Sequence, residues 1–133
     1  MDAWDGYPAA RERVFKAALD ANANLISLAG DTHNGWAFDL AQDKTPVGVE
    51  CVLTSVSSGG DGQDMRPGSD RILAENPQLK FINDQRGYGV CEVTPESWRT
   101  DFLVLDRVST PGGTLSRRAS AEVEAGSVNL AIT

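Results

Sequence analysis

The chain has 133 residues, with 12 Lys and Arg against 19 Asp and Glu, and its formal net charge is −7. That length is typical of one ordinary domain. The acidic balance argues against general binding to nucleic acid or acidic membrane surfaces, because such binding needs clustered Lys and Arg. The longest apolar runs, 25–30 and 47–53, are far shorter than the ~20 residues that span a bilayer, so we expect no transmembrane segment.

The first half of the chain predicts one helix and three strands. The helix runs from Pro8, a residue suited to a first helical turn, to about Asn22, and apolar residues recur on one of its faces. Three apolar, strand-like segments follow, and the last two pair as a hairpin: 25–29, 36–40 and 47–53.

The second half opens with a change of composition. Ser, Gly and Asp dominate residues 55–68, which predicts a long mobile loop. A short helix at 69–75 follows, and the tail after residue 113 carries a weaker strand near 121–124 without a strong core pattern. Between them lie three predicted strands, at 79–83, 87–93 and 98–106. The pattern indicates a single layered α/β unit, strand-rich with few helices.

The most specific chemical feature is the turn Gly-Asp-Thr-His at 30–33, which directly follows the first predicted strand. It contains the only histidine of the chain, His33, two residues after Asp31. A carboxylate and an imidazole are good metal ligands, and the carboxyl ends of strands are where open α/β sheets bind ligands. The sequence therefore predicts metal ligands at Asp31 and His33. Alternatively, Asp31 caps a local turn and His33 packs beside Trp36.

Asn34 and Trp36 follow this pair closely. Asn34 can orient a ligand or a substrate oxygen, and Trp36 can shield the site from water. The alternative is a turn residue followed by a core aromatic, and for Trp36 the core interpretation is favoured.

Three other patterns carry less weight. Residues 59–64 match the start of a calcium-binding nonapeptide, but one copy cannot build a β-roll, so a flexible loop is favoured. Serines at 55–58 lack the Gly-x-Ser-x-Gly context of a hydrolase nucleophile. Cys51 and Cys91 are interpreted as small buried residues rather than a disulfide or a zinc site.

An ordered set of short segments resembles one family. They are Trp-Asp-Gly-Tyr-Pro-Ala-Ala-Arg at 4–11, Gly-Asp-Thr-His at 30–33, Asn-Pro-Gln-Leu-Lys-Phe at 76–81, Arg-Gly-Tyr at 86–88 and Val-Thr-Pro-Glu at 93–96. In this order they resemble the C-terminal part of the PhoD-type alkaline phosphatases. The resemblance covers about residues 1–120, and 121–133 form a weakly matching tail within the same predicted domain, 1–133.

The resemblance implies the C-terminal half of a metallophosphoesterase α/β/β/α sandwich. It also implies hydrolysis of phosphomonoesters or phosphodiesters, iron and calcium as the metals, and export to the periplasm or outside the cell. Where the wider superfamily closes its site with Gly-His-x-His, this chain has Asp31 in place of the first histidine. That change favours calcium, a metal that prefers oxygen ligands, at Asp31 and leaves iron to His33.

The superfamily motifs that supply the other metal ligands, of the Asp-x-His, Gly-Asp-x-x-Asp and Gly-Asn-His types, do not occur before Gly30. Two ligands are too few for a stable metal site. We therefore expect the chain to supply the closing Gly-Asp-x-His motif of a larger enzyme, with the N-terminal half of the same protein as its partner. The alternative is a non-catalytic fragment or interaction module. In either case we expect an uncovered apolar face.

Overall fold

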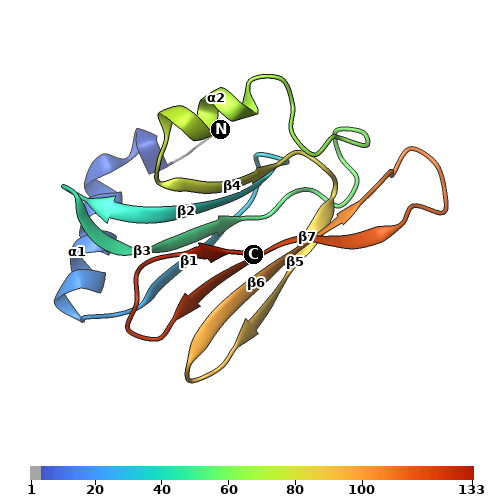
Figure 1. Cartoon of the computed structure of the whole chain (residues 1–133). Coiled ribbons are helices and arrows are strands. Elements are labelled where there is room, and N and C mark those ends of the chain that lie inside the picture. The colour runs from blue at the N-terminus through green and yellow to red at the C-terminus, as the bar shows by residue number, and fades with distance from the viewer. Residues whose placement is uncertain (1–3) are drawn as a thin grey trace.

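The computed structural model describes residues 4–133 and contains two β-sheets packed face to face (Figure 1). Sheet A has the spatial order β1-β3-β2-β4, and sheet B has the order β5-β6-β7-β8. After a short 3-10 helix at Trp4–Gly6, the elements are α1 (Pro8–Asp20), β1 (Leu25–Ala29), β2 (Gly35–Gln42), β3 (Thr45–Val52), α2 (Ser69–Glu75), β4 (Leu79–Asn83), β5 (Gly87–Val93), β6 (Ser97–Leu105), β7 (Leu115–Glu124) and β8 (Ala131–Ile132).

The strand directions in sheet A bring three loops together. β1 pairs with β3 in parallel, whereas β2 is antiparallel to both β3 and β4. β1, β3 and β4 therefore point the same way, and their carboxyl ends meet at one edge, which we call the carboxyl edge. The segments that leave it are 30–34, 53–68 and 84–86. This is the edge at which open α/β sheets bind ligands.

The hydrophobic core lies between the two sheets. Phe81 of sheet A and Phe102 of sheet B meet at its centre, with ring centroids 4.7 Å apart. Gly35 makes room for them, since a Cβ there would lie 3.4 Å from Phe102 Cδ1. Most other buried members alternate along their strands with outward-facing residues, as sheet packing requires; they are Ala37, Val49, Cys51, Ala119, Ala121 and Val123. Leu130, just before β8, completes the cluster.

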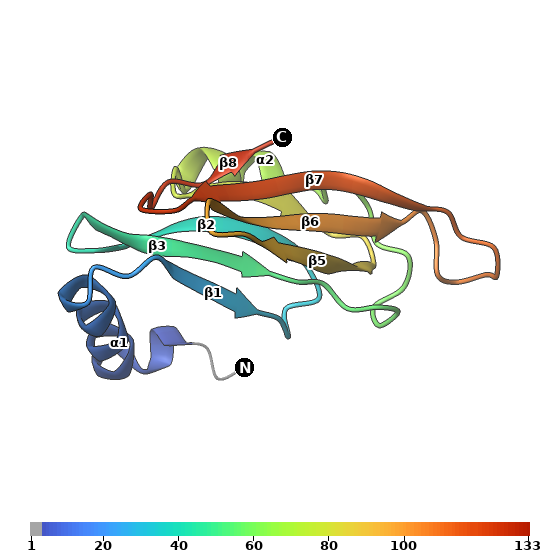
Figure 2. The ribbon, with the colours of Figure 1, turned by 90° about the horizontal axis from the view of Figure 1, so that it is seen from below.

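Both helices belong to the side of sheet A. α1 contacts β3 and α2 contacts β4, and Figure 2 shows α1 beside β3 and β1, away from sheet B. α1 begins at Pro8 and buries Phe15, which meets Trp4 edge to face at 6.4 Å. The two sheets and two helices confirm the predicted strand-rich α/β fold. Within residues 4–133, no helix is long and apolar enough to cross a membrane.

The tail is better ordered than its sequence predicts. β7 runs over ten residues, Leu115–Glu124, and pairs with β6 along its length, where a weak strand near 121–124 was expected. Ala119, Ala121 and Val123 are buried in the core. Alanine has a low strand propensity, and four exposed residues open the strand. Its inward alternation is therefore built from small residues, which hides the pattern in the sequence.

The loop 53–68 has no helix or strand, as predicted, but it is held by many contacts. Both oxygens of Asp61 accept hydrogen bonds, from the backbone N–H groups of Val108 and Ser109 and from the Ser109 hydroxyl, at 2.6–2.7 Å. Asp64 accepts bonds from Arg118 and Asn83. These donors hold the pKa of each carboxyl below its usual value. The loop is therefore fastened to both sheets, an anchoring that its composition does not predict.

The two cysteines are both free. Cys51 is buried as predicted, and burial raises the pKa of its thiol to about 11. Cys91 is exposed, which corrects the expectation that both are buried. The reason is its place on β5, which is an edge strand of sheet B.

Candidate functional site

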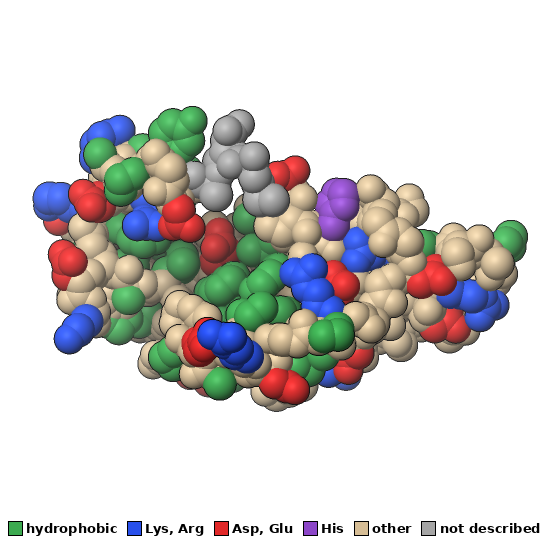
Figure 3. Space-filling view, turned by 90° about the horizontal axis from the view of Figure 1, so that it is seen from above, with side chains coloured by type: hydrophobic (Ala, Val, Ile, Leu, Met, Phe, Trp, Pro, Cys, Tyr) green, Lys and Arg blue, Asp and Glu red, His purple; other side chains and the backbone are tan. Residues whose placement is uncertain are grey.

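Asp31 and His33 lie on the turn that leaves β1 at the carboxyl edge. Both have left-handed backbone conformations, with φ of 71° and 57°, which residues other than glycine seldom adopt. Such conformations cost free energy and cluster at functional sites. Both side chains are exposed, and the single histidine is the purple side chain on the surface in Figure 3. Among the described residues, neither side chain hydrogen-bonds or forms an ion pair. Both are therefore available as ligands.

Asn34, the residue after His33, is buried. Only 4% of it is exposed, and its side-chain N–H donates a hydrogen bond to Oδ1 of Asp84, on the turn that follows β4. The amide therefore fastens the turn after β1 to the turn after β4. Asn34 is placed to hold the His33 turn in shape, and its amide N–H is already engaged.

Trp36 points away from the core. It follows Gly35 on β2, whose missing side chain faces Phe81 and Phe102, so the alternation of the strand turns Trp36 to the outer face of sheet A. There it stacks on Phe38 with centroids 5.9 Å apart and planes at 9°. Trp36 is half-buried on this face and is not part of the hydrophobic cluster between the sheets. A role in shielding the site from water stays a prediction.

Arg86 also lies at the carboxyl edge, and the sequence analysis did not select it as a candidate. Only 2% of it is exposed, although arginine is seldom buried. Its Nη1 donates to the Ser58 carbonyl at 2.7 Å and to the Ser55 hydroxyl at 3.1 Å, and its Nη2 lies 3.5 Å from Oδ1 of Asp84. The available signal was positional, because residues 84–86 follow a strand parallel to β1 and β3.

Gly59 brings the loop after β3 against His33. A Cβ built on Gly59 would lie 3.0 Å from Nη1 of Arg86 and 3.8 Å from Nδ1 of His33, and its φ is +93°. Both the close approach and the positive φ favour glycine. The backbone of residue 59 therefore lies between the histidine ring and the buried guanidinium.

The donor set at this edge suits metal ions but is incomplete. Asp31 and His33 offer an oxygen and a nitrogen ligand, a combination typical of iron and other transition metals. No group of three or more His, Cys, Asp or Glu side chains within residues 4–133 could hold a metal. A bound metal would need further ligands from outside the described residues.

A serine nucleophile and a calcium-binding nonapeptide are less well supported than a metal site at Asp31 and His33. The Ser55 hydroxyl donates to the Ser58 carbonyl at 2.6 Å and accepts from Arg86, so it is not paired with His33 as a nucleophile would be. The carboxylates of Asp61 and Asp64, which a calcium nonapeptide would use, are engaged by protein donors.

Comparison with known proteins agrees with this arrangement. The family model described as PhoD-like phosphatase matches residues 1–102. The chain belongs to the PhoD-like phosphatase family. It is 48% identical to alkaline phosphatase D of Bacillus subtilis (strain 168) over 126 residues, which cover 90% of this chain and 22% of that protein.

A solved structure described as the structure of PhoD has the same fold as this chain. The TM-score is 0.92 and the identity 42%, over 99% of this chain and 26% of the other. The resemblance found in the sequence is thereby confirmed. The chain spans about a quarter of the length of these two relatives.

Proposed function

We propose that this chain forms the closing part of a metal-dependent phosphoester hydrolase that acts on phosphomonoesters or phosphodiesters. The observation that carries the proposal is the pair Asp31 and His33, exposed and unpaired among the described residues, at the carboxyl edge of a chain that belongs to a phosphatase family. Both residues have a left-handed backbone, which fixes the directions in which their side chains leave the turn.

Iron and calcium are the metals we propose. The carboxylate of Asp31 suits a hard cation such as calcium, and the imidazole of His33 suits iron. When bound, such metals polarise a phosphoryl oxygen and lower the pKa of a coordinated water. The fit of this chain is partial, since it offers two of the ligands and the rest must come from elsewhere in the protein.

Asn34 and Trp36 follow the 30–33 turn, and we propose a supporting role for each. Asn34 holds the turn through Asp84, so that Asp31 and His33 keep their left-handed backbone conformations. Trp36 and Phe38 form a stacked aromatic pair on the outer face of sheet A. We propose that Trp36 excludes water from one side of the site once the rest of the protein covers this face.

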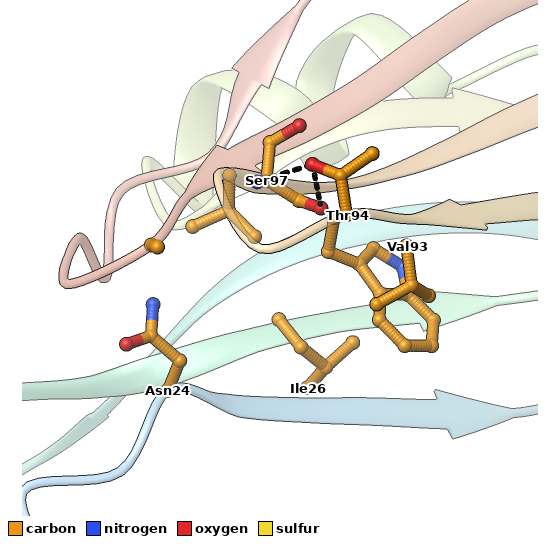
Figure 4. Close-up of a pocket in the computed structure, with 8 residues that line it drawn as sticks. Asn24, Ile26, Val93, Thr94 and Ser97 are labelled. Atoms are coloured by element: carbon orange, nitrogen blue, oxygen red, sulfur yellow. Dashed lines mark hydrogen bonds between the residues drawn. The ribbon is translucent and has the colours of Figure 1, made fainter.

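We propose that the N-terminal half of the same polypeptide is the partner of this chain. Hydrophobic side chains gather in a hollow on the face seen in Figure 3. A second apolar groove, of about 250 Å³, opens beside the edge strand β1 and contains Ile26, Val93 and Trp98 (Figure 4). Surfaces of this kind usually contact another part of a protein, and the relatives are about four times longer than this chain. Export to the periplasm or outside the cell is proposed on family resemblance alone.

The proposal is tested on the full-length protein that contains this chain. Metal content and hydrolysis of an aryl phosphate and a bis-aryl phosphate are measured in the parent protein and in the variants Asp31→Asn and His33→Ala. We expect bound iron and calcium in the parent, less calcium in Asp31→Asn, less iron in His33→Ala, and at least a hundredfold loss of kcat in both.

The alternative is a non-catalytic fragment or interaction module. It predicts that Asp31→Asn and His33→Ala leave the metal content and the hydrolytic activity of the full-length protein unchanged. Hydrolysis that survives chelation of metals would instead favour a metal-independent hydrolase.

A further inference from the structure

Arg86 is a buried charged residue that takes no part in the hydrophobic core. It lies at the carboxyl edge and outside the hydrophobic cluster between the sheets. Burying a guanidinium is costly unless each N–H finds a partner, and Nε of Arg86 has none. A residue kept at such cost calls for an explanation beyond packing.

The contacts of Arg86 connect all three segments that leave the carboxyl edge. Its Nη1 holds Ser55 and Ser58 of the loop after β3. Its Nη2 donates to the carbonyl of Asp84 and forms an ion pair with the carboxylate of the same residue. That carboxylate accepts the hydrogen bond from Asn34, the residue after His33. One guanidinium therefore links the loop after β3 to the turn that carries both candidate ligands.

Burial decides what Arg86 can do. Arginines near phosphate sites commonly bind the phosphate through two parallel N–H groups. Here the side chain is 3% exposed, both terminal nitrogens are bonded to protein oxygens, and Nε is buried. The guanidinium therefore does not offer a free pair of N–H groups to a substrate.

From this geometry we infer that Arg86 is a positioning residue of the site: it holds the His33 turn and the Gly59 backbone in their relative places. This inference rests on the proposed function for its catalytic consequence. A displacement of about 1 Å in a catalytic group can cost about a hundredfold in rate. Lysine cannot replace the planar guanidinium, which donates from several N–H groups, because its ammonium is a compact point charge on a flexible side chain.

The test compares Arg86→Lys with Arg99→Lys in the full-length protein. Arg99 is the control because it is an arginine held in ion pairs, with Glu92 and Asp101, but it is more exposed and lies on β6 of sheet B. Amide hydrogen exchange of segments 30–35 and 53–60 and the kinetics of aryl phosphate hydrolysis are measured well below the unfolding temperature.

We expect Arg86→Lys to raise exchange at least tenfold in both segments and to lower kcat at least tenfold with less than a threefold change in KM. Arg99→Lys should change neither quantity. A merely structural role would lower the unfolding temperature while leaving kcat of the folded protein unchanged, and that result overturns the inference. Unchanged exchange in segment 30–35 overturns it as well.

If Arg86→Lys does not fold, Ser55→Ala carries the test, because it removes one acceptor of Nη1 and leaves the charge in place. The same criteria then apply, with a threefold change expected in exchange of segment 53–60 and in kcat. If the parent protein hydrolyses no phosphoester, the proposed function fails while the exchange data still decide the positioning role.

Discussion

Asn34 and Asp84, fifty positions apart in the chain, are joined by a hydrogen bond between their side chains at the carboxyl edge of sheet A. The bond matters because Asn34 directly follows His33, and Asp84 directly follows β4. Two separate turns are thereby fixed to each other beside the candidate ligands. The contact also provides a direct way to perturb the site without removing a ligand.

We predict that Asn34→Asp destabilises the protein by about 2 kcal/mol. It replaces a buried donor by a second carboxylate facing Asp84, so a hydrogen bond is lost and two like charges are brought together. The free energy of unfolding in urea measures the effect. Asn129→Asp adds the same charge at an exposed position and should change stability by less than about 0.5 kcal/mol. Equal effects of the two changes would contradict the prediction.

Gly59 and Gly60 form a matched pair for testing the close approach to Arg86. Both have positive φ, but a Cβ at Gly60 would meet nothing within 4 Å, whereas one at Gly59 would lie 3.0 Å from Nη1 of Arg86. Gly60→Ala should therefore lower the free energy of unfolding only through the strain of a side chain at positive φ, by about 1 kcal/mol. Gly59→Ala should cost about 1–3 kcal/mol more, through overpacking. Urea unfolding of the two variants measures the difference, and equal costs would show that the guanidinium gives way.

Acid should release the loop 53–68. The pKa of Asp64 is lowered chiefly by its hydrogen bond from Arg118, and that of Asp61 chiefly by its bond from the Ser109 hydroxyl. A depressed pKa contributes stability above the unfolded value, about 3.9, and that contribution is lost as pH falls through the folded value.

We therefore predict that proteolysis within residues 55–64 rises steeply below about pH 4. An acid-active protease such as pepsin, followed by peptide mapping, measures this. With both Asp61→Asn and Asp64→Asn the cleavage should depend less on pH, since neither anchor then titrates. A parallel pH dependence in parent and variant would refute the assignment of the two anchors.

The two cysteines should differ in reactivity. Burial holds the pKa of Cys51 at about 11, so its thiolate is scarce near neutral pH, whereas Cys91 is exposed. Iodoacetamide at about pH 8 should label Cys91 within minutes and Cys51 only after unfolding. Peptide mapping of the two sites by mass spectrometry measures the difference. Rapid labelling of Cys51 in the native protein would show that sheet A opens.

The pattern of the sequence is sufficient to predict most strands and both longer helices, because apolar residues in 25–29, 79–83 and 98–106 recur with the period of a buried strand. It fails for β7, whose inward positions include Ala119 and Ala121, since small residues carry little hydrophobic signal. It also does not reveal the anchoring of the loop 53–68. Composition there suggests mobility, whereas Asp61 and Asp64 find donors far away in the sequence.

Only part of the candidate site can be predicted from the sequence. Asp31 and His33 lie within one turn, so their spacing alone suggests a shared centre. Arg86 joins them only because β4 runs parallel to β1 and β3, a relationship that requires the strand order. No local pattern around residue 86 indicates that its guanidinium is buried.

The backbone N–H groups of Val108 and Ser109, which donate to Asp61, belong to the connection between β6 and β7. The connection between β6 and β7 lies in the opposite sheet from Asp31 and His33, yet it supplies the anchor for the loop beside them. Insertions or substitutions in residues 106–114 can therefore shift the Gly59 backbone without altering any residue of sheet A. Related sequences that share every site residue can still differ in the shape of the site rim through the length of this one hairpin connection.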